Sequence, residues 1–476
     1  MDNKQILVMK FGGTSVGSAD AITQAAAIIK TQVDKWDHVV VVVSAMRGIT
    51  DGLLKSARAA VAGDERYFGP LIEDLRKKHH TVIDDLIQNN GENIPIHREI
   101  DQYIEELTVF CRSIHVMGEV TPRGFDVISS LGERMNARVV AAVMRHISVP
   151  SQAVDATHLI VTDNTFQDAI PLMDATREKT NQYLAPLFEA GVTPIVTGFI
   201  GATEDGIITT LGRGGSDYTS AIMGESLDAS EVWTLTDVDG VMTADPRIVP
   251  EAQVIPELSY SEVGELAYFG AKVLHPKTIR PVIRSGIPLW VKNTFNPQCT
   301  GTRISEERTT PPGMITAITT IKNLSMITVE GRGMLGVPGI AARTFKAVAS
   351  SGTSVLMISQ SSSEQSICFV IPTVNSPEVI RALEEELALE LVRRDIDRVW
   401  AQDDTVILTT IGAGLRHTPG VSARVFGALG RANINVVAIA QGSSEYCMSI
   451  VVEEKDANNA IRGIHKEIIE VEAQDE

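Results

Sequence analysis

The sequence predicts an α/β protein in which a mostly parallel central sheet flanked by helices is followed by two small repeated modules. Three observations lead to this prediction. Apolar β-branched runs alternate with helix-patterned segments up to about residue 303, as in a parallel sheet. Several of these runs end in glycine-rich turns. Beyond residue 313 the chain contains an internal repeat.

Length and charge limit the class of protein. A chain of 476 residues is too long for one ordinary core, so we expect two or three domains. The formal net charge of -18 argues against binding nucleic acid or an anionic membrane and favours a small-molecule partner. The four cysteines have no CxxC spacing, which predicts reduced thiols. An apolar strand from Ile6 leaves no room for a signal peptide, and no stretch approaches the ~20 apolar residues of a membrane span, so we expect a cytoplasmic protein.

The stretch Ile207 to Ala221 is the strongest candidate for chemistry. A β-branched run ends at three glycines that carry Arg213 and Asp217, which predicts a strand, a tight turn and a helix. Backbone N–H groups in such a turn can hold an anion. Arg213 can bind a carboxylate or phosphate through two N–H groups, and Asp217 can orient a donor or accept from an ammonium. An ordinary strand-to-helix turn is the alternative.

A second phosphate-binding candidate lies at the start of the chain. A buried strand from Ile6 delivers Lys10 into a glycine turn that ends at Gly17, and Ser18 or Asp20 is expected to cap the next helix. The lysine precedes the glycines, so this is not a Walker A loop. Backbone N–H groups and one ammonium can still neutralise a polyphosphate.

Two further strand ends carry candidate substrate contacts. Val39 to Val43 predicts a central parallel strand, and Thr50 beyond it is either a substrate contact or a helix N-cap. Residues 128–137 predict a strand-like start and a helix that opens at Glu133. The Glu133 carboxylate would bind a substrate ammonium or favour the helix dipole. The charged, helix-patterned segment of about 55–125 carries no predicted chemistry.

Later turns add the cations Arg247 and Lys272 and the acid Asp237. No metal-ligand cluster or Ser/His/Asp arrangement is visible in the sequence. Together with the residues above, this inventory suits a nucleotide phosphate and an amino-acid-like substrate. We expect this part of the chain to span 1–303, with a polar, breaker-rich linker at 304–313.

The remainder is expected to form two modules, 314–403 and 404–476. Segments of the first recur in the second with a constant spacing of 81 residues, as from Pro338 to Pro419. Each copy predicts the order strand, glycine turn, helix, strand, polar loop, strand, helix. The second copy lacks a final strand, so we predict that 314–321 completes its sheet and that the first module is inserted in the second. The GxGxxG pattern at 331–336 is interpreted as a structural turn rather than a dinucleotide site.

Four motifs carry a family resemblance: Lys10 to Ser15, Leu211 to Asp217, Thr236 to Val241 with Asp245 to Arg247, and Phe269 to Pro276. Together they resemble aspartokinases, of the amino-acid kinase superfamily, and the repeat resembles a pair of ferredoxin-like βαββαβ ACT domains. The resemblance covers essentially the whole chain. It implies ATP-dependent phosphorylation of the side-chain carboxylate of L-aspartate, the first step towards lysine, threonine, methionine and isoleucine.

The resemblance also implies roles for individual residues, with Lys10 and Asp217 as the catalytic pair and Mg²⁺ carried by ATP rather than by protein side chains. Some relatives have an aromatic residue where this chain has Met242, so ring stacking is not expected there. The implied ATP contacts are Lys10, Gly12, Gly13, Thr14, Ser15, Thr236, Asp237, Met242, Arg247, Lys272 and Val273. The implied aspartate contacts are Thr50, Glu133, Arg213, Gly214, Gly215, Ser216 and Asp217.

Paired ACT domains typically bind a feedback amino acid. The loops at 358–364 and 439–445 suit a small zwitterion, with Gln360, Ser361, Gln441 and Gly442 as expected contacts. Their resemblance to threonine-sensitive relatives favours L-threonine over L-lysine as inhibitor. A pure dimerisation platform is the alternative, and in either case we expect a homodimer or a dimer of dimers through these domains.

The chain is also similar to the kinase part of bifunctional aspartokinase–homoserine dehydrogenases. It stops where a dehydrogenase would begin, so we expect no second activity. Another amino-acid kinase, such as acetylglutamate or glutamate 5-kinase, and a non-catalytic amino-acid sensor are the competing interpretations.

Overall fold

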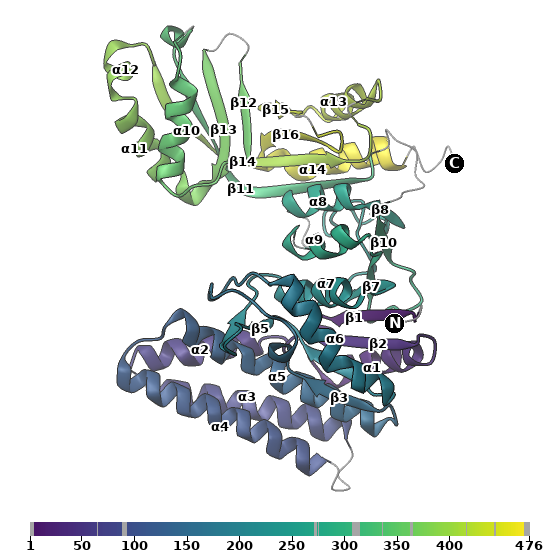
Figure 1. Ribbon diagram of the computed structural model, residues 1–476. Coiled ribbons are helices and arrows are strands. Elements are labelled where there is room, and N and C mark those ends of the chain that lie inside the picture. Colours follow the sequence, from purple (N-terminus) through teal and green to yellow (C-terminus); the bar gives the residue numbers. More distant parts are fainter. Residues whose placement is uncertain are drawn as a thin grey trace. The chain divides into compact units, whose positions relative to one another are not determined.

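The computed structural model describes residues 4–63, 65–87, 93–270, 274, 276–306, 315–335, 337–361, 365–415, 417–441 and 444–470. They form two compact units (Figure 1). The first unit comprises Met1–Val241, Val254–Tyr260 and Val273–Arg308, and the second comprises Met242–Gln253, Ser261–Lys272 and Thr309–Glu476. Two short segments of the range 1–303 therefore pack with the C-terminal part of the chain.

The first unit is built on an eight-stranded sheet with the order β3-β4-β2-β1-β7-β9-β10-β8. Every neighbouring pair is parallel except β9 and β10. The predicted central strand is β2, which lies between β1 and β4 and buries all five of its valines. The strands are β1 (Ile6–Phe11), β2 (His38–Val43), β3 (Ser151–Val154), β4 (Thr193–Thr197), β7 (Glu231–Thr236), β8 (Glu257–Ser259), β9 (Leu289–Asn293) and β10 (Thr302–Ser305).

Helices cover both faces of this sheet. α1 (Ala19–Val33) and α5 (Pro122–His146) pack on one side, whereas α6 (Met173–Glu189) and α7 (Gly215–Leu227) pack on the other, with α9 (Pro276–Ser285) against α7. The predicted α/β architecture is therefore confirmed. A small antiparallel pair, β5 (Ile200–Ala202) and β6 (Ile208–Thr210), precedes α7.

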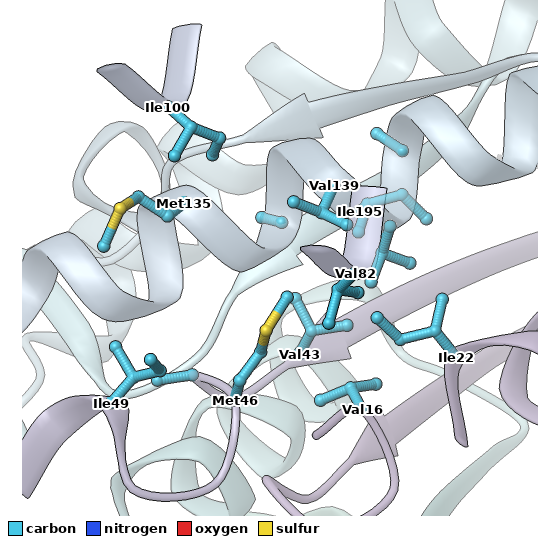
Figure 2. Packing of buried hydrophobic residues seen from close by; sticks show 14 of the residues in the cluster. Val16, Ile22, Val43, Met46, Ile49, Val82, Ile100, Met135, Val139 and Ile195 are labelled. Atoms are coloured by element: carbon cyan, nitrogen blue, oxygen red, sulfur yellow. The ribbon is translucent and has the colours of Figure 1, made fainter. Parts of the chain in front are cut away.

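The charged segment between residues 55 and 125 extends the main core instead of forming a separate layer. It supplies most of α2 (Ile49–Val61) and all of α3 (Glu65–Leu86) and α4 (Asn93–Met117), which lie side by side (Figure 1). Figure 2 shows part of the shared hydrophobic cluster, to which β2, α3, α4 and α5 contribute Val43, Val82, Ile100 and Met135. None of the described helices is both long and apolar enough to cross a membrane.

The second unit contains a six-stranded antiparallel sheet with the order β12-β13-β11-β14-β16-β15. Each half of the sheet has its own helices and its own apolar core. The strands are β11 (Ala317–Glu330), β12 (Met357–Gln360), β13 (Ser366–Pro372), β14 (Arg398–Ile411), β15 (Ala438–Ala440) and β16 (Cys447–Glu453). The helices are α10 (Ile340–Ser350), α11 (Ser376–Glu386), α12 (Ala388–Arg393), α13 (Val421–Arg431) and α14 (Glu454–Ile464).

The strand pairing of the described residues agrees with the predicted insertion of one module in the other. β11 is one continuous strand whose first half, 317–321, pairs with 407–411 of the second module. Its second half, 324–330, pairs with β13 of the first module and with 398–405 of β14. The register shifts between the two halves, where Asn323 has a φ of 60°. A strand that lies before the first module thus completes the sheet of the second.

The interpretation of the GxGxxG pattern as a structural turn is also supported. Gly331 and the short 3-10 helix Arg332–Met334 pack directly on the backbone of residues 395–397. A Cβ on Gly333 would lie 2.5 Å from the Cα of Asp395, and one on Gly331 would overlap the Asp395 carbonyl. These glycines allow a close approach of two backbone segments inside one module. Gly336 lies outside the described residues.

Hydrogen bonds explain why two short segments belong to the second unit. The Thr243 carbonyl accepts from Ile318 N at 2.8 Å, and the Thr243 hydroxyl lies 2.9 Å from His465 Nε2. In α8 (Tyr260–Tyr268), Glu265 accepts from the Ser444 hydroxyl at 2.8 Å. Both segments are thereby tied to the second module.

Candidate active site

Two of the predicted turns meet at a buried ion pair. Lys10 is the fifth residue of β1, and its side chain is nearly buried. Its Nζ lies 2.6 Å from Oδ1 of Asp217, which belongs to the first turn of α7. An ammonium at the end of a buried strand requires such a partner. The two motifs, which lie about 200 residues apart in sequence, therefore form one site.

The glycines after Lys10 are required by close backbone contacts. Gly13 O accepts a hydrogen bond from Arg47 N at 3.1 Å. A Cβ on Gly13 would lie 2.9 Å from the carbonyl oxygen of Ala45, and one on Gly17 would lie 2.6 Å from that of Gly13. The Gly12 N–H donates to Leu235 O at the end of β7. The turn is thus held between β7 and the loop after β2, and Ser18 caps α1 by accepting from Ala21 N, as one of the two predicted caps.

The Arg213 turn depends on left-handed glycines. Gly212 and Gly214 have φ values of 76° and 72°, a region that side chains disfavour. α7 begins at Gly215, where an added Cβ would lie 2.6 Å from the ring of Phe199. The turn therefore sits close to the β4–β5 connection, and the exposed side chain of Arg213 lines a cavity.

Glu133 lies on the buried face of α5 rather than at its start. The prediction of a helix opening at Glu133 is wrong because Thr121 caps the helix by accepting from Gly124 N, and Pro122 occupies its first turn. Residues 128–132 are consequently helical, and the helix-dipole alternative for Glu133 is excluded. Glu133 Oε1 accepts from Ala45 N at 3.2 Å, and burial raises the pKa of this carboxyl from 4.5 to about 8. Its Oε2 is buried without a hydrogen-bond partner among the described residues.

These groups surround one cavity of about 420 Å³. Thr50 lies on its wall, in the first turn of α2; the alternative role as an N-cap is wrong because Gly48 is the N-cap. Sequence reasoning missed several wall residues in the loop after β2, and their position behind a central parallel strand was the available signal. The lining residues are Lys10, Gly13, Ser44, Ala45, Met46, Arg47, Gly48, Thr50, Asp51, Glu133, Phe199, Gly212, Arg213, Gly214, Gly215, Ser216 and Asp217.

Comparison with known proteins assigns the family. The model of the amino acid kinase family matches residues 5–293, and an ACT domain model matches 327–387 and 408–468. The lysine-sensitive aspartokinase 3 of Escherichia coli is 33% identical over 467 residues, which cover 98% of this chain and 100% of that protein. The chain belongs to the amino acid kinase family, among the aspartokinases.

Other relatives extend this similarity. The chloroplastic bifunctional aspartokinase/homoserine dehydrogenase 1 of Arabidopsis thaliana is 37% identical over 96% of this chain but only 50% of its own length. The chain thus spans about half the length of the bifunctional relatives it matches. The crystal structure of E. coli aspartokinase III with aspartate and ADP has a TM-score of 0.79 at 31% identity, covering 98% of this chain and 100% of that chain. The predicted resemblance to aspartokinases and the predicted fold class are confirmed.

On the other side of the Lys10 turn, the end of β7 provides further polar groups. Thr236 is the last residue of β7, the strand next to β1, and Asp237 follows it. The Thr236 hydroxyl donates to Asp237 Oδ1 at 3.2 Å. Ser15 is buried, and its hydroxyl lies 2.7 Å from that of Thr294. The Ser15 side chain is thus engaged with the scaffold, whereas Thr14 and the backbone of Gly12 are partly exposed.

The remaining predicted ATP contacts lie in two later motifs of the sequence. Met242 and Arg247 belong to the segment 242–253 of the second unit, and the Arg247 guanidinium binds both oxygens of Asp245. Lys272 and Val273 lie outside the described residues. Among the residues that are described, no group of three or more His, Cys, Asp or Glu side chains is arranged to hold a metal ion.

The predicted effector residues lie in the ACT modules. Gln360 lines a cavity of about 290 Å³ together with residues 337–341 at the start of α10. The Ser361 N–H, next to the end of β12, donates to Ser366 O at 3.2 Å at the start of β13. Gln441 is exposed just beyond β15, and Gly442 lies outside the described residues.

The buried Glu133 carboxyl predicts an unusual pH dependence of stability. The folded chain keeps this proton up to about pH 8, whereas the unfolded chain releases it above its ordinary pKa of 4.5. Unfolding free energy should therefore fall as pH rises between these values, by up to about 1.4 kcal/mol per pH unit. Glu133→Gln should remove this contribution. Urea unfolding at pH 5, 6, 7 and 8 measures it, with the exposed Glu119→Gln as control. An unchanged slope in Glu133→Gln contradicts the assignment.

Proposed function

We propose that the chain is an aspartate kinase that transfers the γ-phosphoryl group of ATP to the side-chain carboxylate of L-aspartate, giving 4-phospho-L-aspartate. The observation that carries this proposal is the single cavity lined by the Lys10–Asp217 pair, the Arg213 turn and Glu133. It combines cations for phosphate and carboxylate with one carboxyl group for an ammonium. Crystal structures of E. coli aspartokinase III in complex with aspartate and ADP, and in complex with lysine and aspartate, support this choice.

Phosphoryl transfer here relies on position and charge. The Lys10 ammonium neutralises phosphate oxygens, and Asp217 holds that ammonium in place. Mg²⁺ carried by ATP supplies further positive charge. A carboxylate oxygen of aspartate bonds to the γ-phosphorus while the bond to the ADP oxygen breaks, so no proton is removed from the nucleophile and no protein base is needed.

Aspartate is proposed to bind on the opposite wall. Arg213 binds one carboxylate through two N–H groups, with Thr50 and the turn at 214–216 beside it. Glu133 receives the substrate ammonium, which makes use of the free acceptor capacity of Oε2. An adjacent ammonium lowers the pKa of a carboxyl group, so Glu133 ionises as aspartate binds.

We assign the nucleotide to polar groups at the end of β7, and four further residues are included because they belong to the family motifs. Thr236 and Asp237 lie beside the Lys10 turn through the pairing of β7 with β1. Met242, Arg247, Lys272 and Val273 complete the proposed set through their motifs alone.

The setting of the enzyme is part of the same proposal. We place it in the cytoplasm, at the first step towards lysine, threonine, methionine and isoleucine, as a homodimer or dimer of dimers. The β12 edge of the second sheet, with the exposed side chain of Ile358, supports association through the ACT modules.

The first of three predictions from this function concerns turnover and substrate. A coupled assay of ADP release should detect activity with L-aspartate and far less with L-glutamate or N-acetyl-L-glutamate. Lys10→Ala should lose at least about 10²-fold in kcat, because phosphate charge is no longer neutralised. Thermal unfolding controls for an intact fold. Near-normal turnover by a folded Lys10→Ala protein contradicts the role of Lys10, and activity with another amino acid alone contradicts the substrate.

The second prediction separates the two substrates. Arg213→Lys keeps the charge but loses the paired N–H geometry, so KM for aspartate should rise about tenfold or more while KM for ATP stays within about twofold. Steady-state kinetics with each substrate varied in turn gives both values. An equal rise in both KM values means that Arg213 serves the nucleotide.

The third prediction concerns feedback. L-threonine, with L-lysine as runner-up, should inhibit by binding a less active arrangement, and a coupling of ~1–3 kcal/mol suffices. Gln360 in its cavity supports a site of this kind. Titration of activity with each amino acid on wild type, Gln360→Ala and Gln441→Ala should show weaker inhibition in the variants. Inhibition by lysine alone changes the effector, and inhibition by neither leaves a dimerisation platform.

A further inference from the structure

Asp126 is a buried carboxylate that ties two loops to one helix. It lies in the first turns of α5 and is 1% exposed. Its Oδ2 accepts from Gln167 N at 3.0 Å and from Thr210 N at 3.2 Å, and its Oδ1 accepts from the Thr210 hydroxyl at 2.8 Å. Burial raises the pKa of this carboxyl, and the three hydrogen bonds oppose that rise.

Both loops held by Asp126 lead to the Arg213 turn. Thr210 is the last residue of β6 and directly precedes Leu211 and Gly212. Gln167 has a φ of 70°, and its carbonyl oxygen would lie 3.1 Å from a Cβ on Gly212. Ala169 N donates to Thr210 O at 2.9 Å, which joins the two loops to each other. Asp126 therefore anchors the two loops that pack against the left-handed turn carrying Arg213.

The same helix also anchors the opposite wall of the cavity. Glu133 follows Asp126 by seven residues, which is two helical turns, so both side chains lie on one face of α5. Glu133 accepts from Ala45 N, and Asn136 donates to Ser44 O at 2.6 Å. α5 thus holds the loop after β2 at one point and the Arg213 turn at another. A rigid helix sets the distance between these two anchor points.

We propose that Asp126 is a positioning residue for substrate binding: it holds the Thr210–Ser216 turn so that the Arg213 guanidinium is presented to a carboxylate of the substrate. The proposal rests on the aspartate kinase function proposed above. Asp126 contributes through hydrogen-bond acceptance rather than through contact with the substrate. Small displacements of a binding group cost large factors in catalysis, so the anchor determines how well Arg213 works.

Two substitutions at Asp126 separate positioning from direct contact. Asp126→Ala removes every acceptor and should raise KM for aspartate about tenfold or more, with KM for ATP within about twofold. Asp126→Asn should restore KM for aspartate to within about threefold of wild type. The amide oxygen can accept from both backbone N–H groups, and the amide NH₂ can donate to the Thr210 hydroxyl. If Asp126 bound the substrate ammonium by its charge, the asparagine variant would fail as badly as the alanine variant.

A matched control removes a comparable buried carboxylate that binds the same helix from outside it. Asp155 is buried and accepts from Arg134 Nε at 3.1 Å and from Arg138 Nη1 at 2.5 Å, both on α5. Asp155→Ala should lower the thermal midpoint but leave KM for aspartate within about threefold. A selective rise in KM for aspartate in Asp155→Ala as large as that in Asp126→Ala would mean that any damage to α5 has this effect, and would overturn the proposal.

A measurement without turnover keeps the proposal testable if Asp126→Ala folds poorly or the wild type does not phosphorylate aspartate. Amide hydrogen exchange of peptides covering 165–169 and 208–216 should accelerate about tenfold or more in Asp126→Ala and in Thr210→Val, but not in Thr210→Ser. Unchanged exchange in a folded Thr210→Val protein overturns the anchor. If the wild type is inactive but shows the expected exchange pattern, only the proposed function is overturned. If the wild type is active but Asp126→Ala raises KM for aspartate and KM for ATP equally, only the positioning role is overturned.

Discussion

The contact between Lys10 and Asp217 is the constraint on which the first unit depends. A lysine at the end of a buried strand is tolerated only if a carboxylate meets it, and Asp217 does so from the start of α7. This fixes α7 against β1. The glycines on either side are required by other close contacts, since Gly13 lies against the Ala45 carbonyl and Gly215 against the Phe199 ring. The parallel order of the sheet then brings the turns after β1, β2 and β7 to one edge. The cavity forms at this edge, where the turns meet.

Local patterns predicted the strands and the site turns well. The run of valines in β2 and the glycines around Lys10 and Arg213 each express a rule that acts within about ten residues. Residues 128–137 predicted a strand-like start and a helix opening at Glu133, whereas Thr121 and Pro122 begin the helix earlier. Gly132 is required instead by packing: a Cβ there would lie 2.9 Å from the Ala45 side chain. A close contact between segments that are far apart in the sequence leaves no pattern in the residues around either of them.

Long-range partners were the part that sequence could not supply. Asp126 was overlooked because its role is defined by Gln167 and Thr210, which lie on other elements. The attachment of segment 242–253 to the second module depends on Thr243 meeting Ile318 and His465. The pairing of β11 with the second module was predictable from the number of strands. Two modules of this kind need eight strands, and the second module lacks its last one. The missing strand must therefore come from another part of the chain. Counting the strands that a fold requires can thus predict a pairing that the chemistry of individual residues does not reveal.

The shared strand β11 also bears on how the chain acquires its structure during synthesis. Its first half pairs with residues 407–411, which leave the ribosome about 90 residues later. At typical elongation rates of ~5–20 residues per second, this edge waits several seconds for its partner. In that interval it is an unpaired strand, open to association with a neighbouring nascent chain. The polar residues Thr319, Thr320 and Lys322 along this strand therefore have a protective value before the native sheet exists.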